Sequence, residues 1–179
     1  MPCSEQTQKG IDLMVNFFKQ RPNLKVLDVG VGMGKWSKLV RETVNTIHGV
    51  EAFEPYVERF KLESLYDKIY IQDIREFEYE EKYDVAILGD VLEHLEYEDA
   101  IKLILKLKAK IPVIFLTIPI SDCPQDGALY GNDYETHRYQ WNDTQIQTEL
   151  SFKLLSAGRD PGCFAVVGTY MWPSAEWNE

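Results

Sequence analysis

Residues 26–34 read Val-Leu-Asp-Val-Gly-Val-Gly-Met-Gly, and this stretch decides the fold of the chain. Val26 and Leu27 end an expected buried strand, three glycines alternate after it, and a helix is expected from Lys35. Glycine tolerates positive φ and has no Cβ, so a ligand can press against the backbone of such a turn. A strand, a glycine turn and a helix in this order predict a cradle for a nucleotide-like cofactor near the helix N-terminus.

The spacing of the glycines selects among nucleotide cofactors. The dinucleotide fingerprint Gly-x-Gly-x-x-Gly needs a glycine where this chain has Lys35. Instead, Gly30, Gly32 and Gly34 follow Asp28, a pattern that resembles motif I of the class I S-adenosylmethionine-dependent methyltransferases. In that family the acidic residue and the glycine turn hold the methionine part of the cofactor, so the resemblance implies this role for all four residues. The other interpretation is a glycine-rich turn without a ligand.

An acidic residue after the second expected strand, at 47–53, is a candidate for holding the ribose. In nucleotide-binding βαβ units, an acidic residue about 20 positions after the glycines accepts hydrogen bonds from the ribose hydroxyls. Glu54 lies at this position, and a carboxylate accepts both hydroxyl protons. Glu51 is a second candidate for the same role, but a residue inside the strand is expected to alternate with its neighbours rather than lie at the tip.

The third and fourth expected strands extend the resemblance. A short strand at 68–72 is followed by Asp73 and Ile74, at positions where the family binds the adenine amino group and the adenine ring. Residues 84–95 read Asp-Val-Ala-Ile-Leu-Gly-Asp-Val-Leu-Glu-His-Leu and resemble the region that lies under the donor methyl group in many family members. The resemblance therefore implies that Asp73 and Ile74 bind adenine and that Asp90 lies near the methyl group.

The whole chain is predicted to form one α/β domain over residues 1–179. Alternating elements predict a doubly wound, Rossmann-like fold with a mostly parallel sheet. The expected strands are 24–29, 47–53, 69–72, 83–88 and 111–118, and the expected helices are an opening helix after Ser4, 35–44, 56–66, 97–109 and 143–150. Two apolar runs, 151–157 and 163–172, are expected to form a closing hairpin. The hairpin matches the family's seven-stranded sheet, whose last strand is antiparallel.

Composition favours a cytoplasmic protein that is not inserted in a membrane. No apolar run approaches the roughly 20 residues needed to span a bilayer, and the N-terminus lacks the features of a signal peptide. Cys3, Cys123 and Cys163 are scattered and odd in number, which predicts free thiols in a reducing compartment. The net charge of −10 argues against nucleic acid as a partner but does not exclude it, because local patches matter more than totals. The oligomeric state stays open.

The connection at 119–142 is predicted to be a lid or an acceptor loop. Loops of this length are uncommon unless they are functional or disordered, and its mixture of aromatic and polar residues suits an acceptor pocket. His137 is the candidate catalytic base, because the pKa of histidine lies near neutrality, and Asp90 is the candidate catalytic carboxylate. The alternative for His137 is a lid histidine packed among tyrosines. The lid leaves room for a small-molecule acceptor or for an open site that faces a larger partner.

A metal site is a further possibility. The sequence Asp90-x-x-Glu93-His94, together with His137, resembles the small-RNA 3′-terminal 2′-O-methyltransferases. Those enzymes use Glu-x-x-Glu-His and a distal histidine to bind a divalent metal that engages the terminal hydroxyls. This chain departs from the pattern with Asp90 for the first glutamate and Gln140 for a later one. Without a metal, Glu93 and His94 are expected to begin a helix, whose dipole favours a carboxylate.

The sequence therefore leaves several functions open. The favoured function is methyl transfer from S-adenosylmethionine to a small-molecule acceptor, and the first alternative is metal-assisted methylation of RNA 3′ ends. A non-catalytic nucleotide-binding module and a nicotinamide-dependent oxidoreductase are the others. Asp28 and Glu54 argue against a module that has lost its ligand, and Lys35 argues against nicotinamide.

Overall fold

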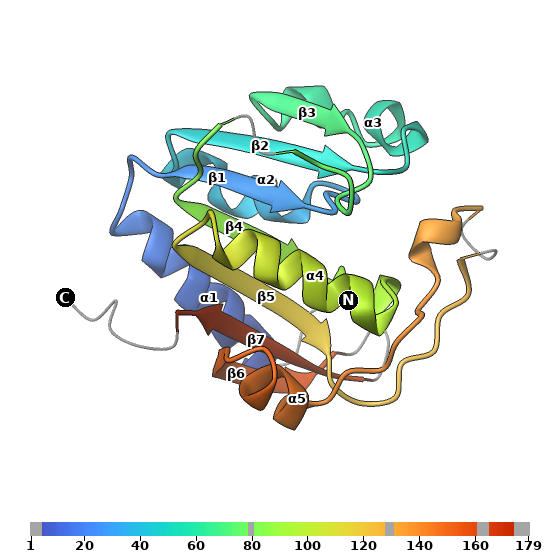
Figure 1. Cartoon of the computed structure of the whole chain (residues 1–179). Coiled ribbons are helices and arrows are strands. Elements are labelled where there is room, and N and C mark those ends of the chain that lie inside the picture. The colour runs from blue at the N-terminus through green and yellow to red at the C-terminus, as the bar shows by residue number, and fades with distance from the viewer. Residues whose placement is uncertain (1–4, 79–80, 128–130, 161–164, 174–179) are drawn as a thin grey trace.

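A seven-stranded sheet in the order β3-β2-β1-β4-β5-β7-β6 forms the centre of the molecule (Figure 1). The computed structural model describes residues 5–78, 81–127, 131–160 and 165–173. β7 runs antiparallel to both of its neighbours, and every other pair is parallel, which confirms the predicted doubly wound fold and its closing hairpin. The strands are β1 (Lys25–Val29), β2 (Thr46–Glu51), β3 (Lys68–Ile71), β4 (Val85–Gly89), β5 (Val113–Pro119), β6 (Lys153–Arg159) and β7 (Val166–Trp172).

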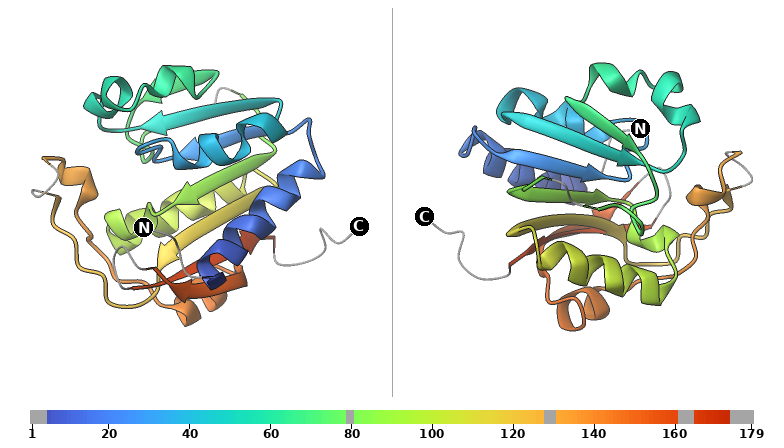
Figure 2. Two further views of the ribbon diagram at one scale, coloured as in Figure 1. Left: turned by 180° about the vertical axis from the view of Figure 1, so that it is seen from behind. Right: turned by 45° about the horizontal axis from the view of Figure 1, so that its top comes forward.

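The helices pack on both faces of the sheet (Figure 2). They are α1 (Glu5–Lys19), α2 (Lys35–Val40), α3 (Pro55–Arg59), α4 (Tyr97–Lys108) and α5 (Asp143–Thr148). Side chains of α1, α2 and α3 form one buried cluster, and side chains of α4 and α5 form the other. The central strands are buried on both sides, which explains why all seven residues of β5 are buried and why its sequence is a continuous apolar run.

Two expected helices are divided in the structure. The helix expected at 56–66 ends at Arg59, because Lys61 takes a positive φ of 53° and a short 3₁₀-helix, η2 (Leu62–Ser64), follows it. The helix expected at 35–44 is α2 followed by the 3₁₀-helix η1 (Arg41–Thr43). Of the predicted free thiols, Cys123 is buried and forms no disulfide. Ser4, Cys3 and Cys163 lie outside the described residues.

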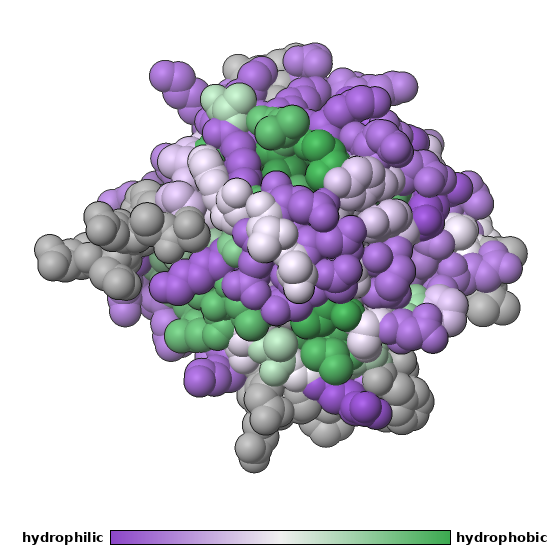
Figure 3. All heavy atoms as spheres, turned by 60° about the horizontal axis from the view of Figure 1, so that its bottom comes forward, coloured by the Kyte–Doolittle hydropathy of each residue, from purple (hydrophilic) through white to green (hydrophobic). Residues whose placement is uncertain are grey.

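The surface and the helix lengths bear on the environment of the protein. On the face shown in Figure 3, apolar side chains gather in separate small groups among hydrophilic ones. Among the residues that the structure describes, no helix is both long enough and apolar enough to cross a membrane.

The sheet order creates a switch point beside β1. β2 lies on one side of β1 and β4 on the other, so the chain leaves the carboxyl ends of these strands in opposite directions. In open α/β sheets, ligands bind in the crevice outside the carboxyl ends at such a point. The loop at 119–142 leaves β5 at the same edge and extends beyond the sheet (Figure 1).

Candidate functional site

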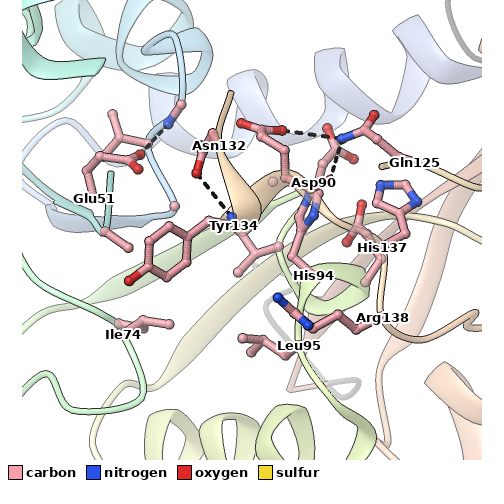
Figure 4. A pocket seen from close by; sticks show the side chains of 18 of the residues that line it. Glu51, Ile74, Asp90, His94, Leu95, Gln125, Asn132, Tyr134, His137 and Arg138 are labelled. Atoms are coloured by element: carbon pink, nitrogen blue, oxygen red, sulfur yellow. Dashed lines mark hydrogen bonds between the residues drawn. The ribbon is translucent and has the colours of Figure 1, made fainter. Parts of the chain in front are cut away.

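A pocket of about 860 Å³ opens at the carboxyl ends of the strands. Its volume lies within the range of about 300–1,000 Å³ that is typical of ligand sites. The glycine turn after β1 and the residues that end β2 and follow β3 form one part of its wall. The segment after β4 and the loop at 119–142 form most of the rest (Figure 4), which is completed by Lys35, Trp36, Asp160 and Val167.

The glycine turn requires its glycines for two different reasons. Gly30, Gly32 and Gly34 all have positive φ, at 67°, 51° and 73°. A Cβ on Gly32 would meet no atom within 4 Å, so this residue leaves open space in the pocket wall. A Cβ on Gly30 would lie 2.6 Å from Val91 Cγ2, and one on Gly34 would lie 2.6 Å from Leu65 Cδ1. Gly30 and Gly32 line the pocket, whereas Gly34 is buried behind the turn.

The acidic residue that reaches the pocket from β2 is Glu51. It is the last residue of β2, is 6% exposed, and accepts hydrogen bonds from Gly32 N and Phe53 N at 2.9 Å each. Burial raises the pKa of Glu51, and the two N–H donors act in the opposite direction. Glu54, which was predicted for the ribose, is exposed at the start of α3 and is not part of the pocket wall.

Asp28 lies behind the pocket rather than in its wall. It is fully buried, and Tyr66 Oη donates a hydrogen bond to its Oδ2 at 2.5 Å. Within the described parts of the chain, its Oδ1 has no hydrogen-bond partner. Burial raises the pKa of Asp28 to about 8, so the carboxyl group is largely protonated at neutral pH.

Asp73 and Ile74 both line the pocket, as their predicted role requires. The Asp73 carboxylate, however, accepts hydrogen bonds from Arg75, at 3.0 Å from Nε and 2.6 Å from Nη2. Ile74 is 8% exposed and belongs to the core beneath the pocket. The pocket wall therefore offers an apolar surface at Ile74 and a carboxylate that Arg75 already orients.

Asp90 follows β4 in a strained conformation. Its φ of 59° is unusual for a residue with a Cβ, and its N–H donates to Thr117 O at 2.9 Å. The carboxylate lines the pocket and lies 3.8 Å from Lys35 Nζ. Desolvation by the surrounding protein raises the pKa of the Asp90 carboxyl, while the positive charge of Lys35 acts in the opposite direction.

Three of the four predicted metal ligands converge. Potential ligand atoms of Glu93, His94 and His137 all lie within 4.8 Å of one another. Glu93 belongs to the 3₁₀-helix η3 (Leu92–His94) and is 2% exposed, and no other described residue donates a hydrogen bond to its carboxylate. Burial and the nearby charge of Asp90 raise the pKa of Glu93 well above its ordinary value. Asp90 lines the same pocket but is not a member of this cluster.

The two histidines of this cluster are both held through Nδ1, each by a backbone carbonyl oxygen. His94 Nδ1 lies 3.3 Å from Thr136 O, and His137 Nδ1 is hydrogen-bonded to Cys123 O. A carbonyl oxygen can only accept, so Nδ1 carries a proton in both rings, and in the neutral form of each ring the lone pair is on Nε2. The ring centroids are 4.8 Å apart, and burial lowers the pKa of His94. An imidazole whose Nδ1 donates to a carbonyl can use the lone pair of Nε2 to accept a proton or to bind a metal ion.

The loop at 119–142 is attached to η3 through the backbone. Arg138 N and Tyr139 N donate to Glu93 O at 2.8 and 3.2 Å. Trp141 is fully buried and donates from Nε1 to Leu92 O at 3.3 Å. Its ring packs against that of Tyr139 at 4.9 Å. Trp141 therefore anchors the loop on η3 and in the hydrophobic core instead of lining the pocket.

A model described as a methyltransferase domain matches residues 5–158, which is most of the chain. The chain belongs to this methyltransferase family. A search of curated protein sequences found no significant match to this methyltransferase domain.

Solved structures with the same fold support the assignment of the architecture. The magnesium protoporphyrin IX methyltransferase of Synechocystis PCC 6803 with bound S-adenosylhomocysteine has a TM-score of 0.68 and 20% identity, over 93% of this chain and 82% of that one. The 1,6-didemethyltoxoflavin-N1-methyltransferase of Burkholderia thailandensis has a TM-score of 0.63 and 14% identity, over 92% and 78%. The small RNA methyltransferase HEN1 has a TM-score of 0.65 and 14% identity, over 95% of this chain and 26% of that one. At these identities, the likeness concerns the fold alone.

The pocket of this methyltransferase domain includes residues that the sequence motifs did not single out. Gln125 lines the pocket and donates from Nε2 to Glu135 O at 2.8 Å. Arg138 and Tyr134 come from the lid, where the sequence indicated only a mixture of aromatic and polar residues. That composition predicted a lid or an acceptor pocket, but the direction of each side chain depends on the path of the loop. Glu51, in contrast, could be suggested from the sequence, where it was the second candidate for binding the ribose.

Proposed function

We propose that this domain transfers a methyl group from S-adenosylmethionine to a small-molecule acceptor. The observation that carries the proposal is a single pocket of about 860 Å³ with two different ends. One end has the open glycine turn and the buried carboxylate of Glu51, and the other has the imidazoles of His94 and His137. The magnesium protoporphyrin and toxoflavin methyltransferases, which share the fold, were solved with S-adenosylhomocysteine bound and act on small molecules.

The residues present fit the cofactor at the end with the glycine turn. Gly32 leaves the backbone open for the methionine part, Gly30 lines the pocket beside it, and Asp28 and Gly34 are buried behind the turn. Glu51 replaces Glu54 as the ribose-binding residue in this proposal, because only Glu51 lines the pocket. A carboxylate whose oxygens face a pocket can accept hydrogen bonds from two hydroxyls.

Ile74 and Asp73 provide the adenine end in the same proposal. The Ile74 side chain offers an apolar surface, and Asp73, oriented by Arg75, offers an acceptor for the adenine amino group. Asp90 lines the same pocket and is the residue proposed to lie near the donor methyl group. When bound, the sulfonium supplies an already activated methyl group, so the protein mainly has to orient the acceptor and exclude water.

His137 is the proposed catalytic base at the acceptor end. Its Nδ1 donates to Cys123 O, which fixes the ring and directs the free lone pair of Nε2 away from that carbonyl. An acceptor hydroxyl or amine can pass its proton to Nε2 as the new bond to carbon forms. The lowered pKa of His94 keeps that neighbouring ring neutral, so it does not repel the imidazolium that forms on His137.

Calorimetric titration tests this function directly. We expect S-adenosylmethionine and S-adenosylhomocysteine to bind at micromolar concentrations and NAD not to bind, because Lys35 occupies the place of the third fingerprint glycine. The second step is incubation with methyl-labelled cofactor and the small-molecule fraction of a cell extract, in which label is expected in a new compound. If neither S-adenosylmethionine nor S-adenosylhomocysteine bound, the proposed function would be excluded.

A second candidate function is the metal-assisted methylation of RNA 3′ ends. The observation that favours it is the buried carboxylate of Glu93, which has no other partner among the described residues and lies beside His94 and His137. Carboxylate and imidazole ligands suit Mn, Fe or Zn, and hydrogen bonds from Nδ1 to carbonyls are the usual way to orient metal-binding histidines. The net charge of −10 counts against RNA.

Metal analysis separates the two candidates. The protein is equilibrated with Mn²⁺, dialysed and measured by elemental analysis, and it is then incubated with short RNA and labelled cofactor. The second candidate predicts about one Mn²⁺ per chain and its loss in His94→Ala and His137→Ala. The bound Mn²⁺ should be retained in the matched variant His48→Gln, because the His48 ring belongs to β2 and packs against Tyr83. A wild-type protein without Mn²⁺ would rule out this candidate and leave the first one intact.

A further inference from the structure

A short turn in the lid brings one aromatic side chain into the pocket. The 3₁₀-helix η5 (Asp133–Glu135) carries Tyr134, which lines the pocket and is 46% exposed. In Figure 4 its ring points toward Glu51 and Ile74, and away from His94 and His137. Tyr134 therefore comes from the acceptor side of the chain but faces the residues proposed to bind the adenosine.

The turn is held in place on both sides of Tyr134. Before it, Asn132 is 3% exposed, and its side-chain oxygen accepts a hydrogen bond from Tyr134 N at 3.0 Å. After it, Glu135 Oε1 accepts a hydrogen bond from Tyr56 Oη at 2.9 Å, and Glu135 O accepts one from Gln125 Nε2 at 2.8 Å. These bonds fix the backbone without any contribution from the Tyr134 ring.

The Tyr134 ring is exposed inside the pocket rather than on the outer surface of the molecule. Six large hydrophobic side chains are exposed among the described residues, and only Met33 and Tyr134 of these line the pocket. An exposed aromatic ring on a fixed backbone inside a concave pocket is typical of a ligand contact. The direction of the ring selects the ligand, because Glu51 and Ile74 are the neighbours toward which it points.

We propose that Tyr134 is a cofactor-binding residue whose ring stacks on the adenosine part of S-adenosylmethionine. This inference rests on the proposed function, since it requires that cofactor. A purine stacks on an aromatic ring through its π face, and removal of one such stack weakens binding by roughly tenfold to a hundredfold. The lid then has two roles, because it carries His137 for the acceptor and Tyr134 for the cofactor.

The test compares two ligands that share adenosine. S-adenosylhomocysteine and 5′-methylthioadenosine, which lacks the amino-acid part, are titrated into the wild type, Tyr134→Ala and Tyr134→Phe. We expect Tyr134→Ala to weaken both ligands by the same factor of about ten or more, and Tyr134→Phe to stay within about twofold of the wild type. The control Leu105→Ala removes another exposed apolar side chain, 63% exposed on α4, and is expected to leave both affinities unchanged.

Different outcomes test the role of Tyr134 and the proposed methyl transfer. Equal affinity of Tyr134→Ala and the wild type for 5′-methylthioadenosine would overturn the role of Tyr134 and leave the proposed function standing. Failure of the wild type to bind S-adenosylhomocysteine would overturn both. Because the Tyr134 ring is exposed and its turn is held by other groups, we expect the melting temperature of Tyr134→Ala to match that of the wild type.

Discussion

The two ends of the pocket are built in different ways. At the cofactor end, the glycine turn, Glu51 and Ile74 all lie within a few residues of the carboxyl ends of parallel strands. At the acceptor end, hydrogen bonds between segments distant in the sequence hold the lid on η3 and hold the two arms of the lid together. Arg138 N donates to Glu93 O at 2.8 Å, and His137 N donates to Gln125 O at 3.0 Å.

Because of this difference, substitutions at the two ends are expected to affect different properties of the protein. Residues at the cofactor end are fixed by the register of the sheet and by the buried core, so changes there are expected to affect both stability and cofactor binding. Residues at the acceptor end are fixed by contacts that the sheet does not need. Changes to the histidines at that end are expected to alter the reaction while leaving the fold and the cofactor affinity intact, whereas Tyr134 is the lid residue proposed to contact the cofactor.

The largest expected effect tests the acceptor end. We expect His137→Ala to lower the rate of labelled methyl transfer by roughly 10² to 10⁴, the usual contribution of a general base. The affinity for S-adenosylhomocysteine should stay within about twofold of the wild type, because the ring lies in the acceptor part of the pocket. A loss of cofactor affinity as large as the loss of rate would break the distinction between the two ends.

The next effect concerns stability at the cofactor end. Burial raises the pKa of Asp28 to about 8, whereas in the unfolded chain the group loses its proton near pH 4. The folded state therefore binds more protons between these values. The free energy of unfolding is expected to fall as the pH rises from 4 to 8, by up to about 5 kcal/mol from this group.

Asp28→Asn makes this effect measurable. The amide carries no titrating proton and can still accept the hydrogen bond from Tyr66 Oη. Urea unfolding at pH 5 and pH 8 is expected to show a smaller difference in stability for the variant than for the wild type. Some dependence should persist, because burial also raises the pKa of Glu51 and Glu93. An identical pH dependence in both proteins would contradict the raised pKa of the buried Asp28 carboxyl.

The sequence predicted the sheet well because local chemistry determines it. Continuous apolar runs, a glycine turn and the 158–162 turn region indicated the parallel strands and the hairpin, and the expected bounds differ by a few residues from those observed. The division of the helix after Pro55 was not predicted, because it depends on the positive φ of Lys61, a residue type that does not signal this conformation.

The site was harder to predict because its geometry depends on distant segments. The choice between Glu51 and Glu54 depends on where β2 ends, and Gly32 N, 19 residues before Glu51, binds the Glu51 carboxylate. The burial of Asp28 involves Tyr66, 38 residues away. The convergence of Glu93, His94 and His137 could be suggested by a family pattern, but the path of the lid decides it. The roles of all these residues remain predictions.

A pair of variants at the end of β2 sharpens the account of the cofactor end. We expect Glu51→Ala to weaken binding of S-adenosylhomocysteine by about 30-fold to 150-fold, or roughly 2–3 kcal/mol, because charge-assisted hydrogen bonds to the ribose are lost. The matched control Glu54→Ala changes an exposed carboxylate three residues later and should stay within about twofold of the wild type. Calorimetry measures both. A strong loss in Glu54→Ala alone would restore the residue that the motif favoured.

The smallest expected effect tests whether the lid and the sheet are one cooperative unit. Tyr56→Phe removes the hydrogen bond to Glu135, so the turn at 132–135 should open more often, at a cost of about 1 kcal/mol. Hydrogen exchange is expected to speed up about fivefold at the amides of Tyr134 and Thr136 and to stay unchanged in β4. The control Tyr97→Phe removes a bond of similar length to Glu149, 2.7 Å, and should leave the turn unaffected. Equal acceleration in the lid and in β4 would mean that the acceptor end opens only when the sheet unfolds. The two ends of the pocket would then have the same free energy of opening.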